Sequence, residues 1–276
     1  MEYGLSTYLY ANERLSSSIL DRILGARFQT IELFAARQHF DYTDRNHVRD
    51  IAQWFLDHEV MLHSVHAPLY GDADWGRSGG LAVSIAHAER RLRIDSMDEI
   101  RRSLDIAEYL PFRFLIVHMG LDDEAYDLRK LDAAMTSLEH LKVSAKELGV
   151  QLLLENVPNE LGTPERLVQF LEYSRLNVKV CLDTGHAHLQ RSLYSAMEIL
   201  GSHVASTHIH DNQGEKDEHL IPFQGSIDWP EAVRSLRKGK GQFSLVLEVS
   251  DNDHKTVLGR LRDVVQRLEE IPGEEE

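Results

Sequence analysis

Short apolar segments recur along the 276-residue chain, and each is followed by a segment with the periodicity of an amphipathic helix. Strands that alternate with helices pair in parallel, because the helix returns the chain to the start of the next strand. Eight such units close a barrel more naturally than they fill an open sheet. We therefore expect one domain, a (β/α)8 TIM barrel over residues 1–271, with a disordered acidic tail at 272–276.

The expected strands cover residues 3–8, 29–33, 60–66, 114–118, 151–155, 178–183, 205–210 and 243–248. The expected helices cover residues 17–24, 46–58, 96–108, 128–148, 164–173, 192–200, 229–237 and 255–268. The alternative fold is a doubly wound sheet. No glycine-rich phosphate-binding segment follows the first strand, and this disfavours the alternative.

Six of the predicted strands end at a residue type that binds metal ions. A parallel barrel gathers the carboxyl ends of its strands at one mouth, so residues far apart in sequence meet there. The strand-end residues are His66, His118, Glu155, Asp183 followed by His186, His210, and Glu248. Burying several carboxylates at one mouth without cations would be costly, and the pattern therefore indicates a bound metal.

The long loop after the seventh strand adds Asp217 and His219 to this set. The nine residues comprise five imidazoles, two aspartates and two glutamates, and none is a thiolate. Such a set suits Zn²⁺, Mn²⁺, Co²⁺ or Mg²⁺, and we expect one to three ions in each chain.

Composition narrows the class of protein. The net charge is −15, whereas a nucleic-acid-binding surface is basic, so we do not expect a nucleic-acid partner. Cys181 is the only cysteine, and it lies in an apolar run, which favours a buried structural thiol in a reducing compartment. The sequence shows neither a signal peptide nor an apolar run long enough to span a membrane. We expect a cytoplasmic protein without membrane contact, and assembly into a homo-oligomer is compatible with the sequence.

Several motifs resemble the xylose isomerase-like TIM barrels. They are ENVPNE (155–160), CLDTGHAHL (181–189), HIHDN (208–212), DEHLIPFQGSIDW (217–229) and LVLEV (245–249), and the resemblance runs from the second strand to the eighth. This superfamily contains sugar isomerases and epimerases, inosose dehydratase-type enzymes and endonuclease IV-type AP endonucleases.

The resemblance implies two different ligand sets. In sugar isomerases and epimerases one divalent metal is held by Glu, Asp, His and Glu, which would be Glu155, Asp183, His210 and Glu248 here. The two glutamates would also transfer protons, and a carbohydrate would be the substrate. The endonuclease IV type holds three zinc ions, and all nine of its ligand positions have matching residue types here.

Charge arithmetic separates these two interpretations. Three divalent ions (+6) against four carboxylates leave +2, which favours a phosphate oxyanion. One ion (+2) against Glu155, Asp183 and Glu248 (−3) leaves −1, which suits a neutral polyol. Basic residues of the mouth loops are offset by nearby acids, so we prefer a sugar isomerase or epimerase. The alternatives are a multi-zinc phosphodiesterase or AP endonuclease, and a non-catalytic metal-binding sugar sensor.

Five further residues are candidates for contacts with the substrate, and each also has a purely structural interpretation. Glu32 could hold a ligand histidine or form a core ion pair, and Arg90 could bind phosphate or begin a solvated helix. Trp229 could line the pocket or staple the following helix. Trp75, in a glycine-containing loop, could cover the substrate. Strand alternation points His208 to the same face as His210.

Overall fold

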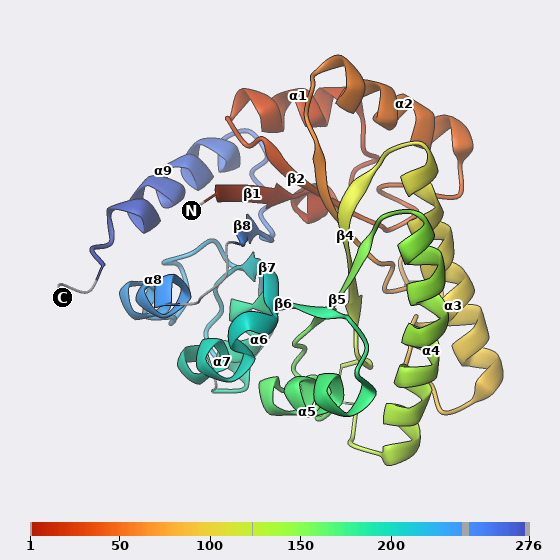
Figure 1. Ribbon diagram of the computed structural model, residues 1–276. Helices are drawn as coiled ribbons and strands as arrows, with labels where there is room; N and C mark the ends of the chain where they lie inside the picture. Colours follow the sequence, from red (N-terminus) through yellow and green to blue (C-terminus); the bar gives the residue numbers. More distant parts are fainter. Residues whose placement is uncertain (1, 123, 192, 239–242, 274–276) are drawn as a thin grey trace.

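The computed structural model describes residues 2–122, 124–191, 193–238 and 243–273. Eight parallel strands form a closed barrel in sequence order, and helices surround it (Figure 1). The predicted (β/α)8 TIM barrel is therefore confirmed. The strands are β1 (Glu2–Ser6), β2 (Thr30–Phe34), β3 (Leu62–His66), β4 (Phe112–His118), β5 (Gln151–Glu155), β6 (Lys179–Asp183), β7 (Val204–Ile209) and β8 (Ser244–Leu247).

The helices follow the strands as expected, with one addition after β6. They are α1 (Ser17–Gly25), α2 (Arg45–Asp57), α3 (Arg90–Leu104), α4 (Leu128–Glu147), α5 (Pro164–Ser174), α6 (Thr184–Leu189), α7 (Leu193–Leu200), α8 (Trp229–Lys238) and α9 (Val257–Glu270). Three 3₁₀ turns accompany them, at η1 (Thr7–Tyr10), η2 (Asp105–Glu108) and η3 (Gly201–His203). The predicted helix start Ser192 and the last three tail residues, 274–276, lie outside the described residues.

The short helix α6 was not predicted, because it follows β6 without an intervening loop. Asp183 ends β6 and immediately caps α6, because its Oδ1 accepts a hydrogen bond of 2.6 Å from the backbone N–H of His186. The predicted helix 96–108 was also placed too late. In the structure α3 begins at Arg90, and residues 105–108 form a 3₁₀ turn.

The apolar core of the described residues has two main parts, and Ala11, Phe34 and Ala36 form a small third cluster. One lies between the barrel and its helices, and it contains most of the buried aliphatic side chains. The other fills the inside of the barrel with Phe114, Ile116, Leu153 and Cys181, which are all buried. Cys181 is thus a packed core residue. Above this inner layer, toward the carboxyl ends of the strands, the interior is polar.

Strand register fixes which polar residues meet. His118 on β4 lies opposite Glu155 on β5, and Asp183 on β6 lies opposite His208 on β7. Neighbouring strands lie about 4.8 Å apart, so paired side chains on the inner face are in contact distance. None of the helices in the described part of the chain is both long and apolar enough to cross a membrane.

Candidate metal centre

Three groups of histidines and acids gather at the carboxyl ends of the strands. Within each group the nitrogen and oxygen atoms that could bind an ion lie within 4.8 Å of one another. The groups are His66, His118 and Glu155; Glu155, Asp183, His208 and Glu248; and His186, His210, Asp217 and His219. The nine residues of the predicted set all lie in these groups, and Glu155 belongs to two of them.

The first group joins β3, β4 and β5. The Nε2 atoms of His66 and His118 lie 3.2 Å apart, and both face the Oε2 of Glu155, at 3.4 and 3.2 Å. The two rings are nearly perpendicular, at 81°. Their lone pairs therefore converge on one point, and two histidines with one carboxylate leave a free position on a tetrahedral ion.

The second group joins β5, β6, β7 and the end of β8, and it includes His208. The Nδ1 of His208 lies 3.1 Å from Glu155 Oε1, 3.3 Å from Glu248 Oε2 and 3.9 Å from Asp183 Oδ2. His208 pairs with Asp183 across β6 and β7. The expected ligand His210 lies beyond the end of β7, and its Nε2 is 3.0 Å from Asp183 Oδ2. Both histidines thus contact the carboxylates of this group, and the role of His210 as a ligand stays a prediction.

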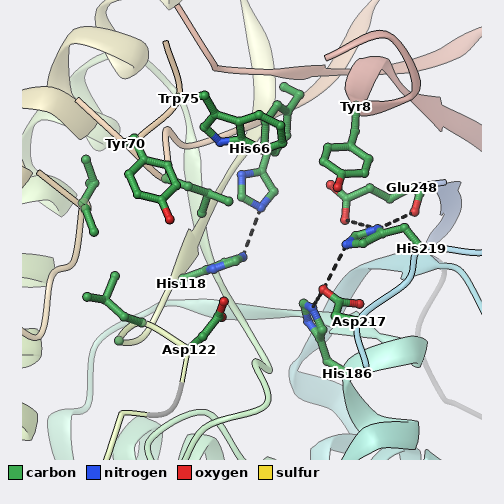
Figure 2. Close-up of a pocket in the computed structure, with 16 residues that line it drawn as sticks. Tyr8, His66, Tyr70, Trp75, His118, Asp122, His186, Asp217, His219 and Glu248 are labelled. Carbon is green, nitrogen blue, oxygen red and sulfur yellow. Dashed lines mark hydrogen bonds and ion pairs between the residues drawn. The ribbon is translucent and has the colours of Figure 1, made fainter. Parts of the chain in front are cut away.

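The third group joins α6 to the long loop between β7 and α8. The Nε2 atoms of His186 and His219 each lie 3.1 Å from the same oxygen, Oδ2 of Asp217, and their rings are perpendicular, at 89° (Figure 2). This loop therefore brings two ligands over the mouth of the barrel, to meet one supplied by β6–α6.

Hydrogen bonds on the far side of three rings test whether a cation fits. The Nδ1 of His66 lies 2.7 Å from the carbonyl oxygen of Ala67, that of His186 lies 2.9 Å from Asn156 O, and that of His219 lies 2.8 Å from Glu248 O. A carbonyl only accepts, so in each ring Nδ1 carries the proton. Each Nε2 then aims a lone pair at a carboxylate or at another lone pair, an arrangement that a cation stabilises.

Buried carboxylate oxygens also indicate that the centre fits a cation. Glu155 is fully buried, and the exposed fraction of Glu248 is 3%. Oε2 of Glu155 and Oε1 of Glu248 receive no hydrogen bond from the described residues. Buried ionised oxygens need hydrogen-bond donors or cations, and the residues of the centre fit a divalent ion.

Burial and neighbouring charged groups shift the pKa values of side chains in the centre. Burial opposes ionisation of Glu155, but His208 and His118 outweigh it and lower its pKa well below the ordinary value. Burial likewise lowers the pKa of His219, yet the hydrogen bond with Asp217 prevails and raises it to about 9. In the metal-free protein, the ring of His219 is therefore protonated at both nitrogens at neutral pH.

Two polar residues next to the ligands hold them in place. The side-chain amide of Asn156 donates to Asp183 O at 3.0 Å and accepts from Asp183 N at 2.7 Å. Asp211 is fully buried, and its carboxylate accepts from the backbone N–H groups of Asn212, Phe223 and Ile227 and from the indole of Trp229. Asp211 thus organises the loop that carries Asp217 and His219.

A cavity of about 350 Å³ opens above the three groups. Its lining includes four aromatic side chains, which are Tyr8, Phe34, Tyr70 and Trp75. The polar side chains of the lining are His66, His118, Asp122, His186, Asp217, His219 and Glu248, and Figure 2 shows Tyr8 beside Glu248 and His219. Neither lysine nor arginine is found among the described residues that line it.

The loop of residues 67–89, between β3 and α3, brings two of these aromatic rings over the cavity. Trp75 has a positive φ of 55°, and Gly76 follows with a φ of 77°. A Cβ atom on Gly76 would lie 2.6 Å from the ring of Tyr70, so only glycine fits there. Asp72 stabilises the turn, because its Oδ1 accepts from the backbone N–H of Gly76 at 2.8 Å.

The five predicted substrate contacts fall in different places. Trp75 lines the cavity, and its placement agrees with the expectation. Glu32 is fully buried below the centre, where Oε2 lies 3.2 Å from His208 Nε2 and accepts from Ser64 Oγ at 2.7 Å. Glu32 therefore holds the ring of His208 from below, which agrees with the expected contact between Glu32 and a histidine of the centre.

Two of the five lie away from the cavity. Trp229 is buried with an exposed fraction of 1%, and its indole is bound to Asp211, so it packs within the protein instead of facing a substrate. Arg90 is exposed at the start of α3, in a groove between α3 and α4. Neither residue lines the cavity, and both positions agree with the structural interpretation.

Tyr8 and Phe34 line the cavity but were not predicted. Tyr8 packs on His219 with 4.6 Å between ring centroids, and Phe34 packs on His66 at 5.0 Å. A pattern of polar residues at strand ends does not indicate aromatic side chains. The first strand also stops at Ser6, and the turn η1 then places Tyr8 at the mouth.

The fold and the site define a parallel (β/α)8 barrel with a candidate metal centre at its carboxyl mouth. The chain belongs to the xylose isomerase-like TIM barrel family, whose model matches residues 20–270. A protein of Methanocaldococcus jannaschii is 27% identical over 244 residues, which cover 86% of this chain and 88% of that protein. D-psicose 3-epimerase of Enterocloster bolteae is 22% identical over 261 residues, which cover 90% of this chain and 82% of that protein. A probable endonuclease 4 of Haloquadratum walsbyi is 25% identical over 253 residues, which cover 84% of this chain and 82% of that protein.

Solved structures show the same fold over almost the whole chain. A D-tagatose 3-epimerase-like protein superposes with a TM-score of 0.75 at 23% identity and 98% coverage of both chains. The IOLI protein, solved with a zinc atom, has a TM-score of 0.75 at 16% identity, with 98% of this chain and 96% of that chain covered.

Proposed function

We propose that this protein is a divalent-metal-dependent isomerase or epimerase that acts on a small sugar or sugar derivative. The cavity carries the proposal. Its volume of about 350 Å³ is near the lower end of the roughly 300–1,000 Å³ typical of small-molecule sites. Its charged lining residues are acids and histidines, and such a lining favours a small neutral polyol over a phosphorylated substrate or a DNA duplex.

The named relatives support the same class of reaction. D-psicose 3-epimerase covers most of the chain, and the D-tagatose 3-epimerase-like protein shares the fold. The IOLI structure holds zinc, and the present centre offers imidazole and carboxylate ligands of the type that zinc, manganese, cobalt or magnesium prefer. The single buried cysteine supports a cytoplasmic location as part of the proposal.

The second ligand group would hold the ion that acts on the substrate. When bound, a divalent cation polarises a sugar carbonyl and acidifies the neighbouring C–H bond. Glu248 lines the cavity, which supports its assignment as the base that takes a proton from that carbon. Glu155 lies among four imidazoles and does not line the cavity, so its role in proton transfer stays a prediction.

The replacement Glu248→Gln tests this assignment. A glutamine keeps the shape of the side chain but cannot take a proton, so the rate of exchange of a substrate α-proton with deuterated water should fall by about 10²–10⁴-fold. NMR measures the exchange, and elemental analysis of the same samples confirms that metal is bound. The exposed Glu172→Gln on α5 is the matched control. Wild-type exchange in the metal-loaded Glu248 variant would refute the proton-transfer role.

A multi-zinc phosphodiesterase is the second candidate, and one observation favours it. The described residues offer three ligand groups, two of which share Glu155, so the centre has ligands for as many as three divalent ions. Three ions against four carboxylates leave a charge of +2, which would attract a phosphate oxyanion.

Metal content and nuclease activity distinguish the two candidates. Three zinc ions per chain, together with chelator-sensitive nicking of an abasic duplex that weakens steeply with salt, would favour the phosphodiesterase. One ion per chain, with α-proton exchange and no nicking, would favour the isomerase or epimerase. Anomalous diffraction identifies the element and counts the ions.

A further inference from the structure

One end of the cavity carries an acid that takes no part in the metal centre. Among the described residues that line the cavity, Asp122 is the one acid or histidine outside the three ligand groups. We propose that Asp122 is a specificity-determining residue, whose carboxylate accepts a hydrogen bond from a free hydroxyl group of the substrate. That hydroxyl lies at the end remote from the reacting carbon. The inference rests on the proposed function and deepens it, because it names a carbohydrate without phosphate or carboxylate at that end.

The topology separates Asp122 from the base proposed above. Asp122 follows β4, whereas Glu248 follows β8, and these strands face each other across a barrel that is closed in sequence order. Figure 2 shows Tyr70 and Asp122 on one side of His118, and Glu248 on the other. A substrate whose reacting carbon lies at Glu248 therefore extends its remaining carbons toward Asp122.

The polar groups at this end of the cavity have no partners within the described part of the chain. The carboxylate of Asp122 forms no hydrogen bond or ion pair there, and neither does the hydroxyl of Tyr70. The indole N–H of Trp75 is buried and also lacks a partner among the described residues. Native proteins pair nearly all of their buried polar groups, so groups left unpaired around a cavity indicate a polar ligand.

The turn that carries Asp122 is held by contacts on both of its sides. The side-chain amide of the buried Asn159 donates to Leu121 O at 2.8 Å, and Glu124 Oε2 accepts from Leu121 N at 3.1 Å. Gly120 has a φ of 94°, and a Cβ atom there would lie 3.1 Å from Asn159 Nδ2. The backbone beside Asp122 is thus fixed before a ligand arrives, which reduces the entropic cost of binding.

A carboxylate at this position distinguishes between the groups that a sugar can carry. An ionised carboxylate only accepts hydrogen bonds, so a hydroxyl group can donate to it, and such charge-assisted bonds are strong. A phosphate or a second carboxylate would meet a like charge, and the described lining residues include neither lysine nor arginine to offset it. A deoxy analogue would displace water from Asp122 and supply no donor.

Binding to the metal-loaded protein tests this assignment by calorimetry. The probes are D-tagatose and D-psicose, each compared with its 6-deoxy analogue and its 6-phosphate. The wild-type protein should bind each parent sugar at least about 10-fold more tightly than either derivative. In Asp122→Asn the shape remains but the charge is lost. Its affinity for the parent sugars should fall by about 10-fold, and its preference over the 6-phosphates should narrow.

Two further variants bracket this effect. Asp132→Asn makes the same change of charge at an exposed position of α4, and it should keep the wild-type affinities. Tyr70→Phe retains the ring but removes a hydroxyl at the same end of the cavity, and it should weaken the parent sugars by about 2–10-fold. Elemental analysis should give the wild-type metal content in all three variants, because neither Asp122 nor Tyr70 belongs to a ligand group.

The outcomes separate failure of this inference from failure of the proposed function. Equal affinities of wild type and Asp122→Asn for the parent sugars, or an equal preference of both over the 6-phosphates, would overturn the role of Asp122. Selective binding as expected, but without exchange of the α-proton with deuterated water, would overturn the isomerase or epimerase proposal and support the role of Asp122. A wild-type protein that binds neither parent sugar would overturn the inference.

Discussion

At the scale of single residues, the ligands depend on neighbours that never touch the cavity. Asn156 is the clearest example. Its side-chain amide pairs with both backbone groups of Asp183, and its own carbonyl oxygen accepts from Nδ1 of His186. One buried residue therefore fixes a ligand of the second group and a ligand of the third, and it directly follows Glu155 in the chain.

Replacing Asn156 with aspartate should disturb the centre more than the fold. The carboxylate can still accept from Asp183 N, but it cannot donate to Asp183 O, and it adds a buried negative charge. We expect metal affinity to fall by about 10–100-fold and the free energy of unfolding to fall by about 1–3 kcal/mol. Chelator titration and urea denaturation measure the two effects. The exposed Asn177→Asp should change neither, and equal behaviour of the two variants would contradict the role of Asn156.

The sequence predicted which residues would meet, but not how each side chain is turned. Strand ends identify His66, His118 and Glu155 because the closed barrel has only one carboxyl mouth. Which of His208 and His210 lies opposite Asp183 depends on the register between β6 and β7, which shifts near Val180 and Cys181. Alternation along a single strand places both histidines on one face, and it contains no information on that shift.

At the scale of elements, the loop between β7 and α8 behaves as a preformed part of the site. Asp217 and His219 come from this loop, and its shape depends on the buried carboxylate of Asp211. A Cβ atom on Gly225 would lie 2.3 Å from Asp211 Oδ1, so the backbone closes tightly around that carboxylate. The sequence indicated only a long loop with functional residues, because such contacts form only after the loop has folded.

Replacing Asp211 with asparagine should loosen this loop. The amide nitrogen would face N–H donors that now bind carboxylate oxygens. We expect the free energy of unfolding to fall by about 2–4 kcal/mol, because buried donors lose their acceptor. The ion held by His186, Asp217 and His219 should also bind more weakly.

The matched control lies in the same loop. Asp228→Asn affects an exposed residue that caps α8 through a single hydrogen bond to Glu231 N, and it should cost less than about 1 kcal/mol. Urea denaturation of both metal-loaded variants provides the comparison. A loss in Asp211→Asn no larger than in Asp228→Asn would show that the carboxylate does not organise the loop.

At the scale of the whole molecule, protons and metal ions compete for the same nitrogens. Burial lowers the pKa of His186, but Asp183 and Asp217 raise it well above the ordinary value, and the pKa of His219 is raised to about 9. In the unfolded chain both have a pKa of about 6.5. The metal-free fold therefore gains stability from these protons below pH 6.5 and loses it as the pH rises toward 9.

Metal binding should reverse this dependence. An ion replaces the protons, so the metal-bound protein keeps its stability as the pH rises. We expect the difference in urea midpoint between metal-loaded and metal-free protein to grow from pH 6.5 to pH 9. In His219→Gln the growth should be smaller. A difference that is constant across this range would contradict the assignment of protons to these rings.

The origin of Tyr70 and Trp75 in a loop that supplies none of the candidate ligands has an evolutionary corollary. Tyr70 and Trp75 belong to a turn that its own glycine and Asp72 hold together, whereas the cation-binding groups come mainly from strand ends and from the β7–α8 connection. Descendants of this gene could exchange that turn and accept new molecules while the reactive chemistry is inherited intact. Selectivity and reactivity can then diversify independently.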